Sequence, residues 1–155
     1  MEAHSAWYNR IAQNIGLYQD TLSKKDAKKY KLDLLLRVAR RVDEFSAYCG
    51  ECQLFQPEIR QLSDELGNLV QVPGKEGQRR HSKAIDRMVK HLQKKHKMVT
   101  PGYYVGICMG IGAVLGTALG TALEYSGAGS GIGIVLGLAV GSYLDRKAKR
   151  EKRVI

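Results

Sequence analysis

The stretch from Gly102 to Leu144 carries a single charged residue, Glu124, and its glycines recur mostly at four-residue intervals. A membrane-spanning helix needs about 20 apolar residues, which residues 102–123 supply and residues 127–144 nearly supply. Small residues four apart let helices approach closely in lipid, where no hydrophobic force drives them together. The pattern therefore predicts two transmembrane helices joined by a short turn at Glu124–Ser130. The glycines expected at helix contacts are Gly106, Gly110, Gly116, Gly120, Gly129, Gly133, Gly137 and Gly141.

This glycine pattern resembles bacterial glycine-zipper proteins with two transmembrane segments, over residues 102–144 only. The resemblance implies a two-helix membrane hairpin, an architecture found in anchors, oligomeric scaffolds and pore-formers alike. One glycine face per helix would be enough for a monomeric hairpin. Here glycine occupies more than one side of each helix, with Gly131 opposite Gly133, and we therefore expect a homo-oligomer. A soluble alternative, a buried pair of core helices, needs more covering surface than residues 1–99 can provide.

Positive charge is concentrated on both sides of the predicted hairpin. Residues 1–74 hold ten basic and ten acidic side chains, whereas residues 75–97 hold nine basic and two acidic, and residues 145–155 hold six and two. Lys and Arg next to membrane segments are retained on the cytoplasmic side, so we expect a cell-membrane protein with both termini cytoplasmic. The same clusters attract anionic lipid, and we interpret the net charge of +10 through membrane lipids and not through nucleic acid.

The first hundred residues have helical periodicity and no strand-like alternation. Apolar residues predict helices over 6–22, from Lys28 through Cys52 with a break between Gly50 and Pro57, over 58–69, and over 79–99. Ser23 is placed to cap the second of these helices. The predicted fold is therefore all-α: a cytosolic helical bundle (1–99), a glycine-rich transmembrane hairpin (100–144) and a basic cytosolic tail (145–155).

Cysteine and histidine spacing predicts a metal site. Cys49 and Cys52 form a Cys-x-x-Cys pair, and His91 and His96 are spaced as zinc ligands are. A thioredoxin-type redox pair lacks its βαβ context, and too few cysteines exist for an iron–sulfur cluster. The alternative is that both cysteines are small buried side chains. On a regular helix the two histidines lie about 140° apart, so we expect convergence only if the helix loosens near its end.

No catalytic triad, phosphate loop or dinucleotide motif is present, and the predicted metal, most simply structural zinc, would join two helices. We therefore predict a non-catalytic, oligomeric membrane anchor or scaffold that holds a soluble cytosolic partner or enzyme complex at the membrane. One alternative is a pore-forming or transport protein with a conduit of glycine-rich helices. A further alternative is a metal- or redox-sensing membrane protein that signals through Cys49 and Cys52.

Overall fold

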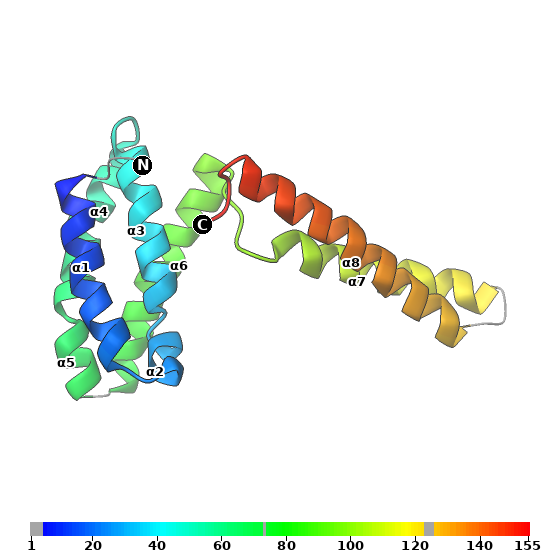
Figure 1. Ribbon diagram of the computed structural model, residues 1–155, viewed down its shortest axis with the longest axis horizontal. Helices are drawn as coiled ribbons and strands as arrows, with labels where there is room; N and C mark the ends of the chain where they lie inside the picture. The colour runs from blue at the N-terminus through cyan, green and yellow to red at the C-terminus, as the bar shows by residue number, and fades with distance from the viewer. Residues whose placement is uncertain (1–4, 73, 123–125) are drawn as a thin grey trace. The chain divides into compact units, whose positions relative to one another are not determined.

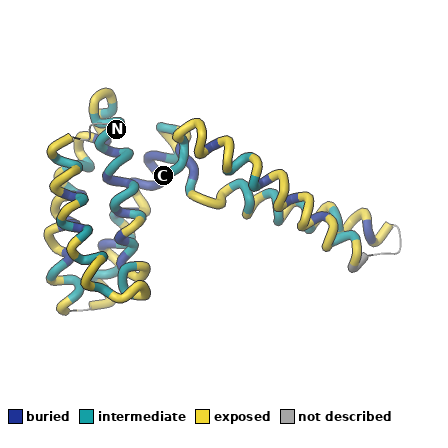
Figure 2. The backbone as a smooth tube through the Cα atoms, in the orientation of Figure 1, coloured by how far each residue is buried: buried dark blue, intermediate teal, exposed yellow. Residues whose placement is uncertain are grey.

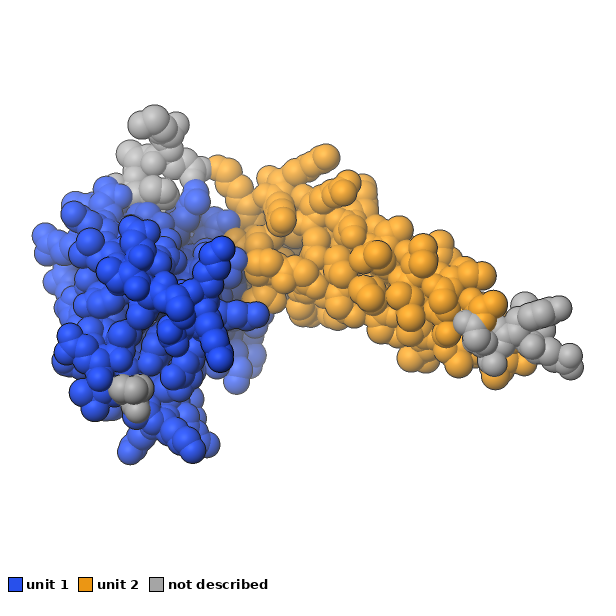
Figure 3. Space-filling model, turned by 60° about the horizontal axis from the view of Figure 1, so that its bottom comes forward, with its two compact units in different colours: residues 1–96, 155 blue, residues 97–154 orange. Residues whose placement is uncertain are grey.

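The computed structural model describes residues 5–72, 74–122 and 126–155, and every regular element in these ranges is a helix (Figure 1). The chain divides into two compact units, residues 1–96 with Ile155 and residues 97–154, which are coloured separately in Figure 3. The expectation of an all-α protein with two apolar C-terminal helices is confirmed. The helices are α1 (Ala6–Thr21), α2 (Lys24–Lys29), α3 (Leu32–Ser46), α4 (Gly50–Asp64), α5 (Leu66–Gln71), α6 (Lys75–His96), α7 (Tyr103–Ala122) and α8 (Ser126–Arg150).

The first unit is a helical bundle organised around α3, which packs against α1, α4 and α6. Its core consists of aliphatic side chains at helical spacing, and Ile15, Leu35 and Leu92 have no exposed surface. Buried positions form one stripe along each of these helices, which Figure 2 shows as dark segments facing the interior. Burial of such a stripe is the main source of stability for an amphipathic helix.

Local capping explains where the first helices begin. The hydroxyl of Ser5 accepts a hydrogen bond from the backbone N–H of Tyr8, and the hydroxyl of Ser23 accepts one from Asp26. These bonds satisfy N–H groups that have no partner inside the helix. Ser23 therefore caps a helix as predicted, but that helix is the short α2, and the long helix expected from Lys28 begins only at Leu32.

The predicted break after α3 lies at a different place. Residues 47–49 separate α3 from α4, and Gly50 is the first residue of α4, so the break precedes Gly50. Pro57 lies inside α4 and does not end it. The expectation of a break between Gly50 and Pro57 is therefore wrong. The last helix of the bundle also begins earlier and ends earlier than predicted, at Lys75 and His96.

The second unit is an antiparallel hairpin of α7 and α8. Both helices are long and apolar enough to cross a membrane, and only 6% and 17% of their most apolar windows are buried. The core helices of a soluble protein would be mostly buried instead. Within the predicted turn Glu124–Ser130, residues 123–125 lie outside the described residues, and α8 already includes Ser126 and continues to Arg150.

Glycine backbones form the contact between α7 and α8. A side-chain carbon added at Gly133 would overlap the carbonyl oxygen of Gly112, and one added at Gly129 would lie 2.6 Å from the Cα of Gly120. The positions where an added carbon collides with the facing helix are Gly112, Gly116, Gly129, Gly133, Gly137 and Gly141. By contrast, an added carbon at Gly106, Gly110 or Gly131 would have no neighbour within 4 Å.

The open end of the hairpin is joined by polar contacts. The carboxylate of Asp145 accepts hydrogen bonds from the backbone N–H groups of Tyr104 and Val105, at 3.2 Å and 3.4 Å. A carboxylate at the first turn of a helix satisfies free N–H groups and complements the helix dipole. A single bridge pairs Val99 with Val154, so the segments that enter and leave the hairpin lie side by side.

Candidate metal centre

Two cysteines and two histidines converge where the α3–α4 junction meets the last turns of α6. The Sγ atom of Cys52 lies 3.5 Å from the Nε2 atoms of both His91 and His96, and Sγ of Cys49 lies 3.5 Å from Nε2 of His91. All four ligand atoms lie within 4.8 Å of one another. The residues singled out by spacing could therefore bind one metal ion.

The cysteines reach the site from the start of a helix. Cys49 is the extended residue that precedes α4, with φ −125° and ψ 108°, and Cys52 lies in the first turn of α4. The short non-helical segment 47–49 reverses the chain after α3 and aims both sulfur atoms at α6. The sequence pattern placed both cysteines on the helix predicted to begin at Lys28. In the structure they lie beyond the end of α3, at the start of α4.

The histidines converge without any loosening of α6. The helix remains regular to its last residue, His96, although His91 and His96 are about 140° apart around its axis. Each imidazole is long enough to bring its Nε2 to a common point beside the helix. The expected need for a loosened helix is therefore wrong, because the side chains and not the backbone make the adjustment.

The carboxylate of Glu51 contacts the other ring nitrogen of His91, Nδ1. When Nδ1–H donates a hydrogen bond to Glu51, Nε2 of the neutral imidazole carries the lone pair that faces the two thiols. Metal-bound histidines almost always have such a partner, which sets the tautomer and the orientation of the ring. Glu51 therefore prepares His91 to act as a ligand.

Aromatic rings surround the two histidines. His96 stacks on Phe45 with ring centroids 3.9 Å apart and an interplanar angle of 7°, and Tyr48 meets it edge-on at 6.4 Å. Phe55 meets His91 edge-on at 5.2 Å. The rings limit the motion of both imidazoles.

Two of the four side chains, Cys52 and His96, have pKa values shifted towards their neutral forms. Burial, together with a hydrogen bond and the charge of Cys49, raises the pKa of the Cys52 thiol to about 12. Burial, followed by repulsion from His91, lowers the pKa of His96. A bound divalent cation would lower the pKa of the Cys52 thiol again, because the positive charge stabilises the thiolate.

The remaining histidine and cysteine of interest lie elsewhere. His81 is buried in α6, where its Nε2–H donates to the carbonyl oxygen of Tyr30 at 3.0 Å. Cys108 belongs to α7 in the second unit. Neither is a member of the four-residue cluster.

The sequence did not identify the supporting residues. Glu51 stands between the two cysteines, and its proximity to them in the chain was the only available signal. Phe45 looked like an ordinary part of an apolar stripe, and Tyr48 and Phe55 carried no signal. Their roles depend on the junction at residues 47–49, which periodicity alone does not locate.

No protein-family model, curated protein or solved structure matches this chain.

Proposed function

We propose that this protein is a non-catalytic, oligomeric anchor of the cell membrane that holds a soluble cytosolic partner or enzyme complex at the membrane. The observation that carries this proposal is the inverted packing of the hairpin. Large apolar side chains such as Val114 and Leu119 are 69% and 67% exposed, while glycine backbones occupy the helix contact. Such a surface is unfavourable in water and favourable in hydrocarbon.

Zinc is the proposed ion at the four-residue cluster. With bonds of about 2.3 Å to sulfur and 2.0–2.1 Å to nitrogen, a tetrahedral zinc ion places sulfur and nitrogen ligands about 3.6 Å apart. Three of the four Sγ–Nε2 separations are 3.5 Å. The ligand set of two thiols and two imidazoles also suits zinc better than magnesium or calcium, which prefer oxygen.

The proposed zinc is structural. Four protein ligands fill a tetrahedral shell, whereas a catalytic zinc keeps one position open for water or substrate. The ion would join the start of α4 to the last turns of α6. Since Tyr103 begins α7 only seven residues after His96, the ion would stiffen the part of the bundle from which the chain passes to the membrane.

Assembly of several copies is supported by the glycines that the hairpin does not use. Gly106 and Gly110 lie one turn apart on α7, and an added carbon at either would have no neighbour within 4 Å. Glycine inside a helix costs roughly 0.8–1 kcal/mol relative to alanine in water. Close approach of a second chain provides a reason for keeping glycine at these two positions.

A conduit between the helices has less support. The hydroxyl of Thr117 donates to the carbonyl of Ala113, and that of Thr121 to the carbonyl of Thr117, each at 2.7 Å. These bonds satisfy the hydroxyls within their own helix, so they do not form the polar lining that an ion pathway needs.

The proposed orientation places both termini in the cytoplasm. The end of α8 carries Lys147, Lys149 and Arg150, and the Asp145 contacts place it beside the start of α7. Lys94 and Lys95 lie in the last turn of α6. The segment before α7 and the end of α8 are therefore both basic, as expected for segments on the cytoplasmic side of a membrane.

Native mass spectrometry of the protein purified from its own host in detergent tests the proposal. We expect a defined multimer with one zinc per chain and with additional soluble subunits. A monomer without a partner would contradict the scaffold, and a metal-free chain would contradict the zinc site.

The same measurement also tests the alternative that the protein is a metal or redox sensor. Oxidation would join Cys49 to Cys52 with the release of the metal, and a sensor requires that this change the number of chains in the assembly. An unchanged multimer after treatment with hydrogen peroxide would support the purely structural role of the ion.

A further inference from the structure

One face of α6 is a continuous basic ridge, formed by six exposed residues. They follow one another at intervals of three or four and lie within an arc of about 120° around the helix. This arc is opposite the buried residues Ile85, Met88 and Leu92. The members of the α6 basic ridge are Lys75, Arg79, Lys83, Arg87, Lys90 and Lys94.

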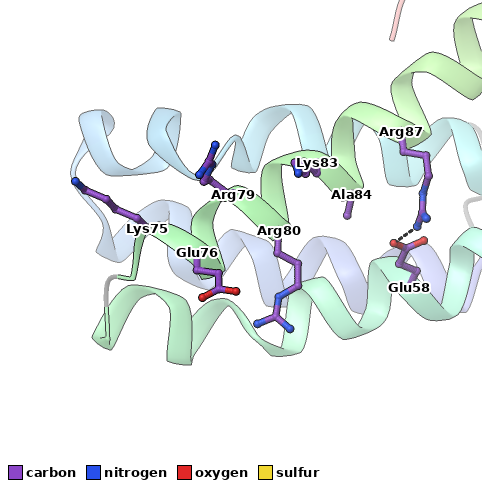
Figure 4. Close-up of a pocket in the computed structure, with 8 residues that line it drawn as sticks. All are labelled: Glu58, Lys75, Glu76, Arg79, Arg80, Lys83, Ala84 and Arg87. Atoms are coloured by element: carbon purple, nitrogen blue, oxygen red, sulfur yellow. Dashed lines mark hydrogen bonds and ion pairs between the residues drawn. The ribbon is translucent and has the colours of Figure 1, made fainter.

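The charge of this ridge is mostly not neutralised within the bundle. Arg87 forms an ion pair with Glu58, and the neighbouring Asp86 is occupied by Lys31 at 2.8 Å. In the described part of the chain the five lysine and arginine side chains other than Arg87 form no ion pair. Figure 4 shows that Arg79 points away from α4, while Arg87 turns towards Glu58.

We propose that the α6 basic ridge binds the anionic head groups of the membrane in which the hairpin is embedded. This inference rests on the membrane placement proposed above. A straight row of charges about 28 Å long, from Lys75 to Lys94, suits a planar array of phosphates. Basic residues close to an anionic membrane surface are attracted to it and are released by salt.

The chain itself restricts the ridge to the neighbourhood of the membrane. Only residues 97–102 separate α6 from α7, and a fully extended segment of this length spans at most about 25 Å. A surface that is tethered so close meets its ligand at a high effective concentration. Weak attraction at each residue is then enough for binding.

Nucleic acid is the competing polyanion, and the composition of α6 does not favour it. Single strands are bound by basic grooves that also carry aromatic side chains for base stacking. The α6 sequence contains no Trp, Tyr or Phe. The ridge therefore offers charge without a surface on which bases could stack.

Lysine acetylation of the full-length protein in lipid nanodiscs tests the proposal. The nanodiscs contain phosphatidylcholine alone or phosphatidylcholine with phosphatidylglycerol, and mass spectrometry reports the acetylation rate of each lysine. We expect phosphatidylglycerol to slow the acetylation of Lys83 and Lys90 about fivefold, which corresponds to about 1 kcal/mol per residue. The exposed Lys24 and Lys25 of α2 are the internal control and should not change, and high salt should abolish the protection.

Charge reversal identifies the ridge as the binding surface. The double variant Arg79→Glu/Lys83→Glu should abolish the protection of Lys90, whereas Lys24→Glu/Lys25→Glu should leave it intact. Because these side chains are exposed, both variants should retain the helicity of the parent protein.

Three outcomes would overturn the proposal. The first is an equal acetylation rate of Lys83 and Lys90 in both lipids. The second is protection of Lys24 and Lys25 while the ridge is not protected. The third is binding of a DNA oligonucleotide that requires Arg79 and Lys83, with no effect of the lipid. A protein that leaves nanodiscs of both compositions would instead contradict the membrane anchor itself, so the two failures are distinguishable.

Discussion

The bundle and the hairpin bury opposite kinds of residue. In the bundle, Ile15 and Leu35 are completely buried and charged residues face outwards, whereas in the hairpin Val114 and Leu119 face outwards and glycines are enclosed. Water drives apolar surface inwards in the first case. In lipid that force is absent, and close backbone packing determines which residues meet. In both regions the enclosed residues are those that allow the closest contact. In water these are large apolar residues such as leucine, and in lipid they are glycines.

The largest effect is expected from a substitution that disrupts the glycine contact between α7 and α8. In Gly133→Leu the new side chain would collide with the backbone of Gly112 and should destabilise the hairpin by about 3 kcal/mol, at the upper end for overpacking. Unfolding of the reconstituted protein in a titration with sodium dodecyl sulfate, followed by circular dichroism, measures this loss.

Gly131→Leu is the matched control for that variant. It lies two residues away on the same helix, and an added carbon there has no neighbour within 4 Å. We expect no loss of the contact between α7 and α8 within one chain, because leucine favours a helix more than glycine does. An effect of this variant on the multimer alone would instead report contacts between chains. Equal destabilisation by the two variants would show that the glycine contact does not hold the hairpin together.

Removal of the metal should weaken the bundle and leave the hairpin unaffected. With free zinc one hundred times above its dissociation constant, bound zinc stabilises the folded state by about 2.7 kcal/mol. Chelation or Cys52→Ser should abolish this contribution, whereas Cys108→Ser in α7 should not. Thermal unfolding with and without chelator, together with metal analysis, measures the effect. An unchanged melting temperature after chelation would refute the structural role of the ion.

A smaller effect is expected from the partner of His91. Glu51→Gln retains the shape of the side chain but weakens the contact that orients the imidazole, and should lower zinc affinity about 10–100-fold. Competition with a chromophoric chelator measures this affinity. Glu58→Gln is the control, because Glu58 lies in α4 like Glu51 but forms a surface ion pair with Arg87 of α6. It should leave the affinity unchanged.

The smallest effect concerns His81 in the bundle core. Burial lowers its pKa in the folded state, so the unfolded chain binds the proton more tightly and stability falls as the pH drops below about 6.5. His81→Gln keeps a donor for the Tyr30 carbonyl and cannot titrate. The pH dependence of unfolding in urea should become flatter in this variant, by at most about 1.4 kcal/mol per pH unit. An unaltered slope would indicate that His81 has the same pKa in both states.

Much of the architecture was predictable from the sequence. Helical periodicity and the absence of alternation predicted an all-α protein, and the apolar run from Gly102 predicted the two long helices, because both signals are local and repeat many times. The ligand residues Cys49, Cys52, His91 and His96 were also recognisable, since metal binding restricts residue type and spacing.

Only the tertiary structure decided how these parts meet. The junction at residues 47–49, which aims the cysteines at α6, follows from the packing of α3 against α4 and α6 and leaves no periodic signal. The tertiary structure likewise assigned Gly112 and Gly133 to the hairpin contact and left Gly106 and Gly110 open, although each of them lies four residues from another glycine. Spacing determines which residues share a face of a helix. Which of those faces is covered depends on how the facing helix is rotated and shifted along its axis, and this depends on contacts between residues far apart in the chain.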